Sequence, residues 1–136
     1  MLLQKIAPMF LLAATACTGV VVVEPIPEVP PERRGDLTMT WTIAGRAEAA
    51  SCDFYAAAEL QIDLYDGGGG LIASEFPSCK DIAITFDLPE GSYDAAVTLL
   101  DPAGRRVSTT LELFDLTVIQ GTEIVSDIDF PRDSIF

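Results

Sequence analysis

From residue 37 onward, hydrophobic and polar side chains alternate with a period of two, which is the pattern of half-buried β-strands. The first run has one apolar face and one threonine-rich face, and its apolar positions are Leu37, Met39, Trp41 and Ile43. Further alternating runs occupy residues 60–65, 82–88, 93–99 and 124–130. Each run predicts a short strand with one face in a core.

The alternation changes phase between Val107 and Ile119. Apolar residues at 111 and 113 give way to apolar residues at 114, 116 and 118. Because a shift of one residue turns every later side chain to the opposite face, this slip predicts a β-bulge or a strand that crosses between sheets.

Turn-forming residues separate the runs, at 66–70, 89–91, 101–104 and 120–122. The stretch from Ala47 to Ala58 is rich in alanine, but Ser51, Cys52 and Asp53 interrupt it, so we expect a loop or a single turn. Six or seven short strands without a long helix predict an all-β fold, an antiparallel β-sandwich.

The segment Leu88-Pro89-Glu90-Gly91-Ser92-Tyr93 resembles the turn and strand entry of immunoglobulin-like, fibronectin-like and transthyretin-like modules. In the first two, the resemblance implies that the tyrosine hydroxyl bonds back to the backbone at the corner. The segment Asp101-Pro102-Ala103-Gly104 is similar to a hairpin of carboxypeptidase-regulatory-like modules. Trp41 precedes the first domain cysteine, so the Cys…Trp…Cys order of antibody domains is absent and the immunoglobulin resemblance concerns architecture only.

The first 16 residues carry one positive charge at Lys5, a short apolar stretch and then small residues that lead into Cys17. This order resembles a bacterial lipoprotein leader, although Ala14 stands where such leaders usually have leucine. The resemblance implies cleavage before Cys17 and lipid on its thiol. Thr18 is not the aspartate that retains such lipoproteins at the inner membrane, so an outer-membrane lipoprotein on the periplasmic or surface face is implied.

Two alternatives remain for the N-terminus. A helix running from Ile6 to Val23 would be an uncleaved anchor, although Pro8, Gly19 and the β-branched residues have low helix propensity. Plain secretion without lipid is the second alternative. All three interpretations place the remaining chain outside the cytoplasm, because Lys5 favours the inner side.

These features divide the chain into a leader at 1–16, a lipidated and proline-rich tether at 17–36 and a β-sandwich at 37–136. The tether holds four prolines between Val20 and Asp36, at Pro25, Pro27, Pro30 and Pro31. Such a segment extends by about 3.1 Å per residue and separates the domain from the membrane.

If Cys17 carries lipid, Cys52 and Cys79 remain as an even pair, which favours a disulfide outside the cytoplasm. A bridge across this loop would add about 3–4 kcal/mol to the free energy of unfolding. Two buried free thiols are the alternative. A zinc site is disfavoured, because the chain has no histidine and two thiolates do not complete a zinc shell.

The chain is strongly acidic, with 21 acidic and 8 basic residues and a net charge of −13. The leader holds one lysine and no acid, so the remaining 120 residues have a net charge of −14. This balance disfavours nucleic acid and anionic lipid headgroups as partners. The charge itself favours solubility, and the 120 residues after the leader are enough for one domain of about 100 residues.

Catalysis has little support in the sequence. Without histidine, no imidazole can activate a serine, and Lys80 is the single lysine after the leader. No spacing distinguishes a pair of carboxylates for glycoside hydrolysis. We therefore expect no enzyme activity and no cofactor.

A structural or protein-interaction module of the cell envelope, held to the membrane by its lipid and contacting another envelope protein, is the function that the sequence favours. A glycan-binding or calcium-binding module is the alternative. Sugar binding would use exposed rings, for which Tyr55 and Tyr65 are candidates. Weak candidates for calcium ligands are the aspartates of loops and outer strand faces, Asp63, Asp66, Asp101, Asp127 and Asp129.

Overall fold

Strand β1 (Arg34–Ile43) forms the centre of the first sheet, and its burial explains why the sequence alternates there. Its four apolar side chains are at most 2% exposed, while the threonines between them lie on the outer face. A computed structural model describes residues 19–136; residues 1–18, which include the predicted leader and Cys17, lie outside the described part. β1 begins at Arg34, three residues before the start expected from the hydrophobic alternation.

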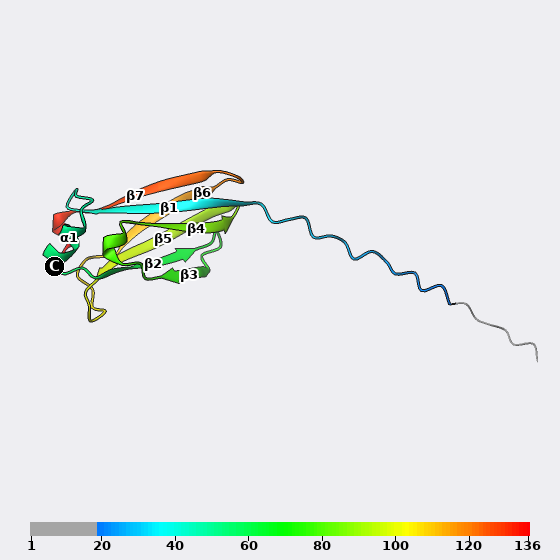
Figure 1. The fold of residues 1–136 in the computed structure, drawn as a ribbon, viewed down its shortest axis with the longest axis horizontal. Helices are drawn as coiled ribbons and strands as arrows, with labels where there is room; N and C mark the ends of the chain where they lie inside the picture. The colour runs from blue at the N-terminus through cyan, green and yellow to red at the C-terminus, as the bar shows by residue number, and fades with distance from the viewer. Residues whose placement is uncertain (1–18) are drawn as a thin grey trace, which may run out of the picture. The chain divides into compact units, whose positions relative to one another are not determined.

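Within residues 19–136, seven strands form two sheets, which confirms the predicted β-sandwich (Figure 1). The first sheet has the order β4-β1-β7, with β4 at Ala83–Pro89 and β7 at Glu123–Phe130. The second has the order β3-β2-β5-β6, formed by Glu59–Tyr65 (β2), Leu71–Glu75 (β3), Gly91–Leu100 (β5) and Leu111–Val118 (β6). An immunoglobulin constant domain instead joins its first, second, fourth and fifth strands in one sheet, so the immunoglobulin likeness is limited to architecture.

Neighbouring strands run antiparallel except for β1 and β7, which are parallel. Leu37 pairs with Ile124 and Ile43 with Phe130, so the first and last strands lie side by side over eight residues (Figure 1). Because both strands run in the same direction, their C-terminal ends meet at one end of the sandwich. The candidate site described below lies at that end.

The phase slip in the sequence corresponds to a β-bulge in β6, as predicted. Phe114 and Asp115 together oppose Asp94 of β5, because the pairing passes from Tyr93–Leu116 directly to Ala95–Leu113. Asp115 has a φ of +57°, and its N–H donates to Asp94 Oδ1 at 3.1 Å. The bulge allows apolar residues on either side of it to face the same core.

The corner between β4 and β5 has the tyrosine hydrogen bond that the resemblance implied. The Tyr93 hydroxyl donates to the carbonyl oxygen of Pro89 at 2.5 Å, four residues upstream. Tyr93 is 6% exposed, and this burial raises the pKa of its hydroxyl above the ordinary value of 10.0. The bond closes the turn that links the two sheets.

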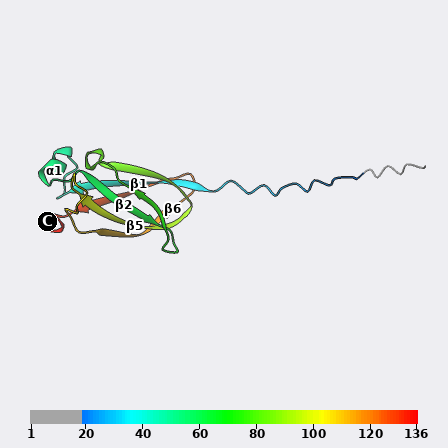
Figure 2. The same ribbon diagram turned by 90° about the horizontal axis from the view of Figure 1, so that it is seen from below.

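The segment expected to be a loop or single turn contains a short helix, α1 (Ala49–Phe54). One further turn of 3-10 helix, η1 (Cys79–Asp81), lies beside it, and a second, η2 (Arg132–Ser134), follows β7. α1 and the C-terminus lie at the end of the sandwich opposite the start of β1 (Figures 1 and 2). Alanine favours helix here, and the covalent link to η1 holds Cys52 in the core.

The compact unit spans Pro31–Phe136, and the preceding segment is a separate unit. Residues 19–30 have no regular secondary structure and every one is exposed. Across residues 19–136, no helix combines the length and the apolar character that crossing a bilayer requires.

Candidate functional site

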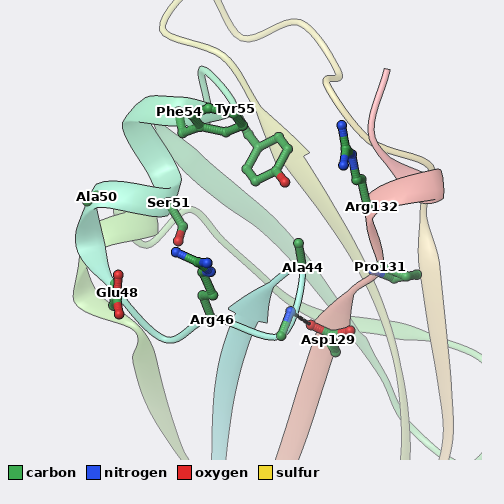
Figure 3. A pocket seen from close by; sticks show the side chains of 11 residues that line it. Ala44, Arg46, Glu48, Ala50, Ser51, Phe54, Tyr55, Asp129, Pro131 and Arg132 are labelled. Carbon is green, nitrogen blue, oxygen red and sulfur yellow. Dashed lines mark hydrogen bonds between the residues drawn. The ribbon is translucent and has the colours of Figure 1, made fainter.

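An open hollow of about 900 Å³ lies at the end of the sandwich where β1 and β7 finish. Its walls come from the turn after β1, from α1 and from the start of η2 (Figure 3). Residues that carry polar or aromatic side chains line much of it: Arg46, Glu48, Ser51, Phe54, Tyr55, Asp129 and Arg132. Its volume is in the range of small-molecule sites.

The turn after β1 positions Arg46. Ile43 and Arg46 exchange backbone hydrogen bonds of 3.0 and 3.1 Å, which reverses the chain over two residues. Both residues of that turn have positive φ, +50° at Ala44 and +75° at Gly45, and the glycine adopts this conformation without steric cost. The reversal directs the chain from the end of the sheet toward α1.

Asp129 joins this turn to the end of β7. Its Oδ1 accepts hydrogen bonds from the Thr42 hydroxyl at 2.6 Å and from the Gly45 N–H at 2.9 Å. The Ala44 N–H also donates to the Phe130 carbonyl at 2.8 Å. Three hydrogen bonds therefore fix the floor of the hollow, so the side chains that project from it start from a rigid base.

Helix α1 supplies the aromatic wall. The rings of Phe54 and Tyr55 lie edge to face, with centroids 4.8 Å apart and planes at 81°. Phe54 is 79% exposed, whereas Tyr55 is half-buried against the core. In Figure 3 the Tyr55 ring lies between the Arg46 and Arg132 side chains.

A second hollow, of about 480 Å³, lies beside the disulfide. Lys80 and Asp53 both line it and form an ion pair, with Nζ 3.0 Å from Oδ1. Because its one cation is already bound to a carboxylate, this hollow offers less polar chemistry than the first.

The predicted pairing of Cys52 and Cys79 is present as a disulfide in the structure. It joins α1 to η1, and both cysteines are at most 1% exposed. The predicted lipidation residue, Cys17, lies outside the described residues.

The five aspartates proposed as weak calcium ligands are spread over strand β2 (Asp63), strand β7 (Asp127 and Asp129) and two turns (Asp66 and Asp101). Asp66 Oδ1 accepts from the N–H groups of Gly68 and Gly70, both at 2.9 Å, and so closes the β2–β3 turn. Asp63 accepts from the Ser74 hydroxyl at 2.5 Å, and Asp127 accepts from Thr40.

Asp101 has the same structural role in the turn after β5. Its Oδ1 accepts from the backbone of Arg105 at 2.8 Å and of Ala103 at 2.9 Å, and these bonds lower the pKa of its carboxyl group. Within residues 19–136, no three acidic or cysteine side chains gather in a way that could hold a metal ion. These five aspartates act as acceptors for the protein's own donors.

Comparison with known proteins gives structural neighbours but no family. No protein-family model matches the chain, and no curated protein matches it. Parts of three solved bacterial structures are similar to it. They are the Bacillus anthracis TIE protein (TM-score 0.45, 15% identity, 73% of this chain and 17% of that chain), a leucine-rich repeat protein from Bacteroides thetaiotaomicron VPI-5482 (0.45, 16%, 74% and 14%) and a candidate adhesin from Bacteroides ovatus (0.43, 9%, 71% and 45%).

The chain thus spans less than half the length of each of these proteins. It is a small all-β domain with structural neighbours in bacterial proteins.

Two residues that line the hollow were candidates from the sequence, Tyr55 for sugar binding and Asp129 as a weak calcium ligand, and the others were missed. Tyr55 was a candidate for sugar binding, and it lines the hollow, but it is half-buried, as is Tyr65, which lies on β2. Arg46 and Arg132 carried no signal of their own. Each follows the end of an apolar strand by two or three residues, and this shared position could have linked them if the parallel pairing of β1 and β7 had been known.

Proposed function

We propose that this protein is a lipoprotein of the bacterial cell envelope, anchored through lipid on Cys17, that displays its β-sandwich as an interaction module. The leader motif supports the anchor: one charge, a short apolar stretch and small residues precede the cysteine. More than one acyl chain would hold the protein firmly, since each buried methylene contributes about 0.8 kcal/mol.

The segment that follows supports display away from the membrane surface. Residues 19–30 are exposed and lack regular structure, and prolines recur through the segment up to Pro31. At about 3.1 Å per residue, the chain from Cys17 to Arg34 can span roughly 50 Å.

The position of the hollow is the observation that carries this proposal. The tether joins the domain at the start of β1, and the hollow lies where β1 ends. A strand of ten residues is roughly 33 Å long, so a tethered domain can present the hollow on the side far from its attachment. A partner can then reach the hollow while the anchor stays in the lipid.

The outer edge of β3 offers a second contact surface for a protein partner. β3 pairs with β2 on one side, and no strand of the described part of the chain pairs with its other edge. Leu71 is 58% exposed and Ile72 is 44% exposed on this strand. Exposed strand edges with apolar side chains accept an added strand from another protein.

Fractionation of cells that express the Cys17→Ala variant tests the anchor. The wild-type chain is expected in the membrane fraction and the variant in the soluble fraction. Thr18→Ala, one residue away, is the matched control and should remain with the membrane. If the Cys17→Ala variant stayed in the membrane fraction, this would contradict the proposal. It would favour the alternative in which an uncleaved helix from Ile6 to Val23 anchors the protein.

Glycan binding is the second candidate function, and the hollow favours it over calcium binding. Phe54 and Tyr55 provide apolar ring surface next to hydrogen-bonding side chains, which is the combination that saccharides need. The aspartates proposed for calcium instead accept hydrogen bonds from separate turns and strands. A sugar bound in the hollow would contact the aromatic rings and the charged side chains at the same time.

A further inference from the structure

We infer that the hollow at the end of β1 and β7 binds an acidic saccharide, with Arg46 and Arg132 each available to a carboxylate group and the aromatic wall holding a sugar ring. The inference rests on the glycan-binding candidate and is independent of the lipid anchor. Beyond the glycan-binding candidate, it specifies that the saccharide is negatively charged and names the residues that recognise this charge.

The two arginines lack carboxylate partners. Neither forms an ion pair within residues 19–136, although acidic residues outnumber basic ones by 21 to 8 in the whole chain. Arg34, Lys80 and Arg105 each pair with a carboxylate at 2.9–3.2 Å. Two guanidinium groups in one hollow therefore remain available to a ligand.

A guanidinium group matches the geometry of a carboxylate. It can donate two parallel N–H···O hydrogen bonds to the two oxygens, and charge assistance makes these bonds about twice as strong as neutral ones. Arg46 and Arg132 come from different elements that face the same hollow (Figure 3). A carboxylate that enters the hollow can bond to either one, and a saccharide with more than one carboxylate can reach both.

The acids that line the hollow restrict what can bind. Glu48 and Asp129 balance the two arginines, and the chain as a whole is strongly negative. A simple inorganic anion would therefore gain little on entering. A saccharide gains more, because its hydroxyl groups can donate to Glu48 while its carboxylate accepts from the arginines.

The aromatic wall, formed by Phe54 and Tyr55, provides an apolar surface on which a sugar ring can pack. Phe54 is 79% exposed, which leaves apolar ring area in contact with water. With Tyr55 at 81° to it, the two rings form a corner that the C–H face of a pyranose can cover. Covering this corner removes apolar surface from water and adds affinity that does not depend on charge.

Calorimetric titration of the full chain in detergent micelles tests the inference, with trigalacturonic acid as the probe. Its carboxyl-reduced counterpart of the same linkage is the neutral control. We expect the neutral trisaccharide to bind at least about tenfold more weakly, since losing two charge-assisted hydrogen bonds costs that much or more. Raising the ionic strength should weaken the binding of trigalacturonic acid more than the binding of the neutral sugar.

Variants assign the effect to residues. The double substitution Arg46→Gln with Arg132→Gln should lower the affinity for trigalacturonic acid by at least about tenfold. Arg106→Gln is the matched control, because Arg106 also lacks an ion pair among the described residues but lies outside the hollow. Phe54→Ala, at an exposed position, should weaken the acidic and the neutral sugar to a similar degree.

Three results would overturn the inference: equal affinity for the two trisaccharides, an equal loss with Arg106→Gln, or no binding of trigalacturonic acid at millimolar concentration. Circular dichroism of each variant establishes that it is folded. Because none of these results bears on where the Cys17→Ala variant fractionates, failure here is distinguishable from failure of the anchor proposal.

Discussion

The indole N–H of Trp41 donates a hydrogen bond to the carbonyl oxygen of Cys79 at 2.8 Å, in the core of the domain. Trp41 belongs to β1, and Cys79 begins η1 and is bonded through its sulfur to α1. One side chain of the first sheet therefore fixes the covalently linked pair of helices that supports the hollow.

Trp41→Phe should lower the free energy of unfolding by about 1–2 kcal/mol, because the buried carbonyl loses its strongest donor. Urea denaturation followed by far-UV circular dichroism measures this, since the substitution removes the tryptophan fluorescence. Tyr65→Phe is the control: its hydroxyl makes no hydrogen bond within residues 19–136, so a change below about 0.5 kcal/mol is expected. Equal stability of Trp41→Phe and wild type would show that the hydrogen bond contributes nothing.

Replacing Cys52 and Cys79 with alanine should destabilise the domain by about 3 kcal/mol or more. The disulfide removes loop-closure entropy from the unfolded chain, and both sulfur atoms are buried. Urea unfolding of the double variant against the oxidised wild type measures the loss. Cys17→Ala, which leaves the pair intact, should unfold like the wild type, and a drop of the same size there would contradict the assignment.

Gly35→Ala should destabilise the domain by about 1–3 kcal/mol through overpacking. A Cβ atom at Gly35 would lie 2.3 Å from the carbonyl oxygen of Ile119 and 3.0 Å from a methyl carbon of Val118. The nearest atom belongs to the backbone and cannot rotate away. Thermal unfolding measures the change, and Gly67→Ala is the control because its Cβ would meet its nearest neighbour at an ordinary 3.5 Å.

Asp101 should make the domain more stable above pH 4 than below it. Hydrogen bonds from the Arg105 and Ala103 backbone lower the pKa of its carboxyl group in the folded state, while the unfolded pKa is about 3.9. A depressed folded pKa gives stability that is complete above the unfolded pKa and is lost as the pH falls through the folded pKa.

Asp101→Asn removes this titration but keeps an acceptor oxygen. The difference in unfolding free energy between wild type and variant should be largest at pH 5–7 and should shrink below about pH 4. Urea unfolding at several pH values measures it, with Glu90→Gln as a charge-matched control in another turn. A difference that stays constant with pH would contradict the assigned cause.

Period-two alternation located the strands that have one buried and one exposed face. It did not locate a strand that is exposed on both faces. Leu71–Glu75 forms β3, yet four of its five residues are exposed on both faces, so no alternation marks it. The pattern did not predict α1 as a helix, because Ser51, Cys52 and Asp53 have modest helix propensity. The disulfide from Cys52 to Cys79 stabilises this segment in addition to its intrinsic propensity.

The hollow could not be read from local sequence. Arg46 and Arg132 are far apart in the chain, and the parallel register of β1 and β7 brings their loops together. A parallel pairing depends on long-range packing, which a period-two pattern does not specify. The cysteine pair, by contrast, was predictable, because lipid on Cys17 would leave only Cys52 and Cys79 to pair.

The parallel pairing of β1 with β7 also determines when the domain can fold. The partners are separated by 87 residues, so β1 gains its second neighbour only after β7 has been synthesised. Contacts of such long range slow folding, and this sheet cannot close until β7 is available. Until the eight residues of β7 pair with it, β1 has β4 as its single neighbour, so the first sheet stays incomplete.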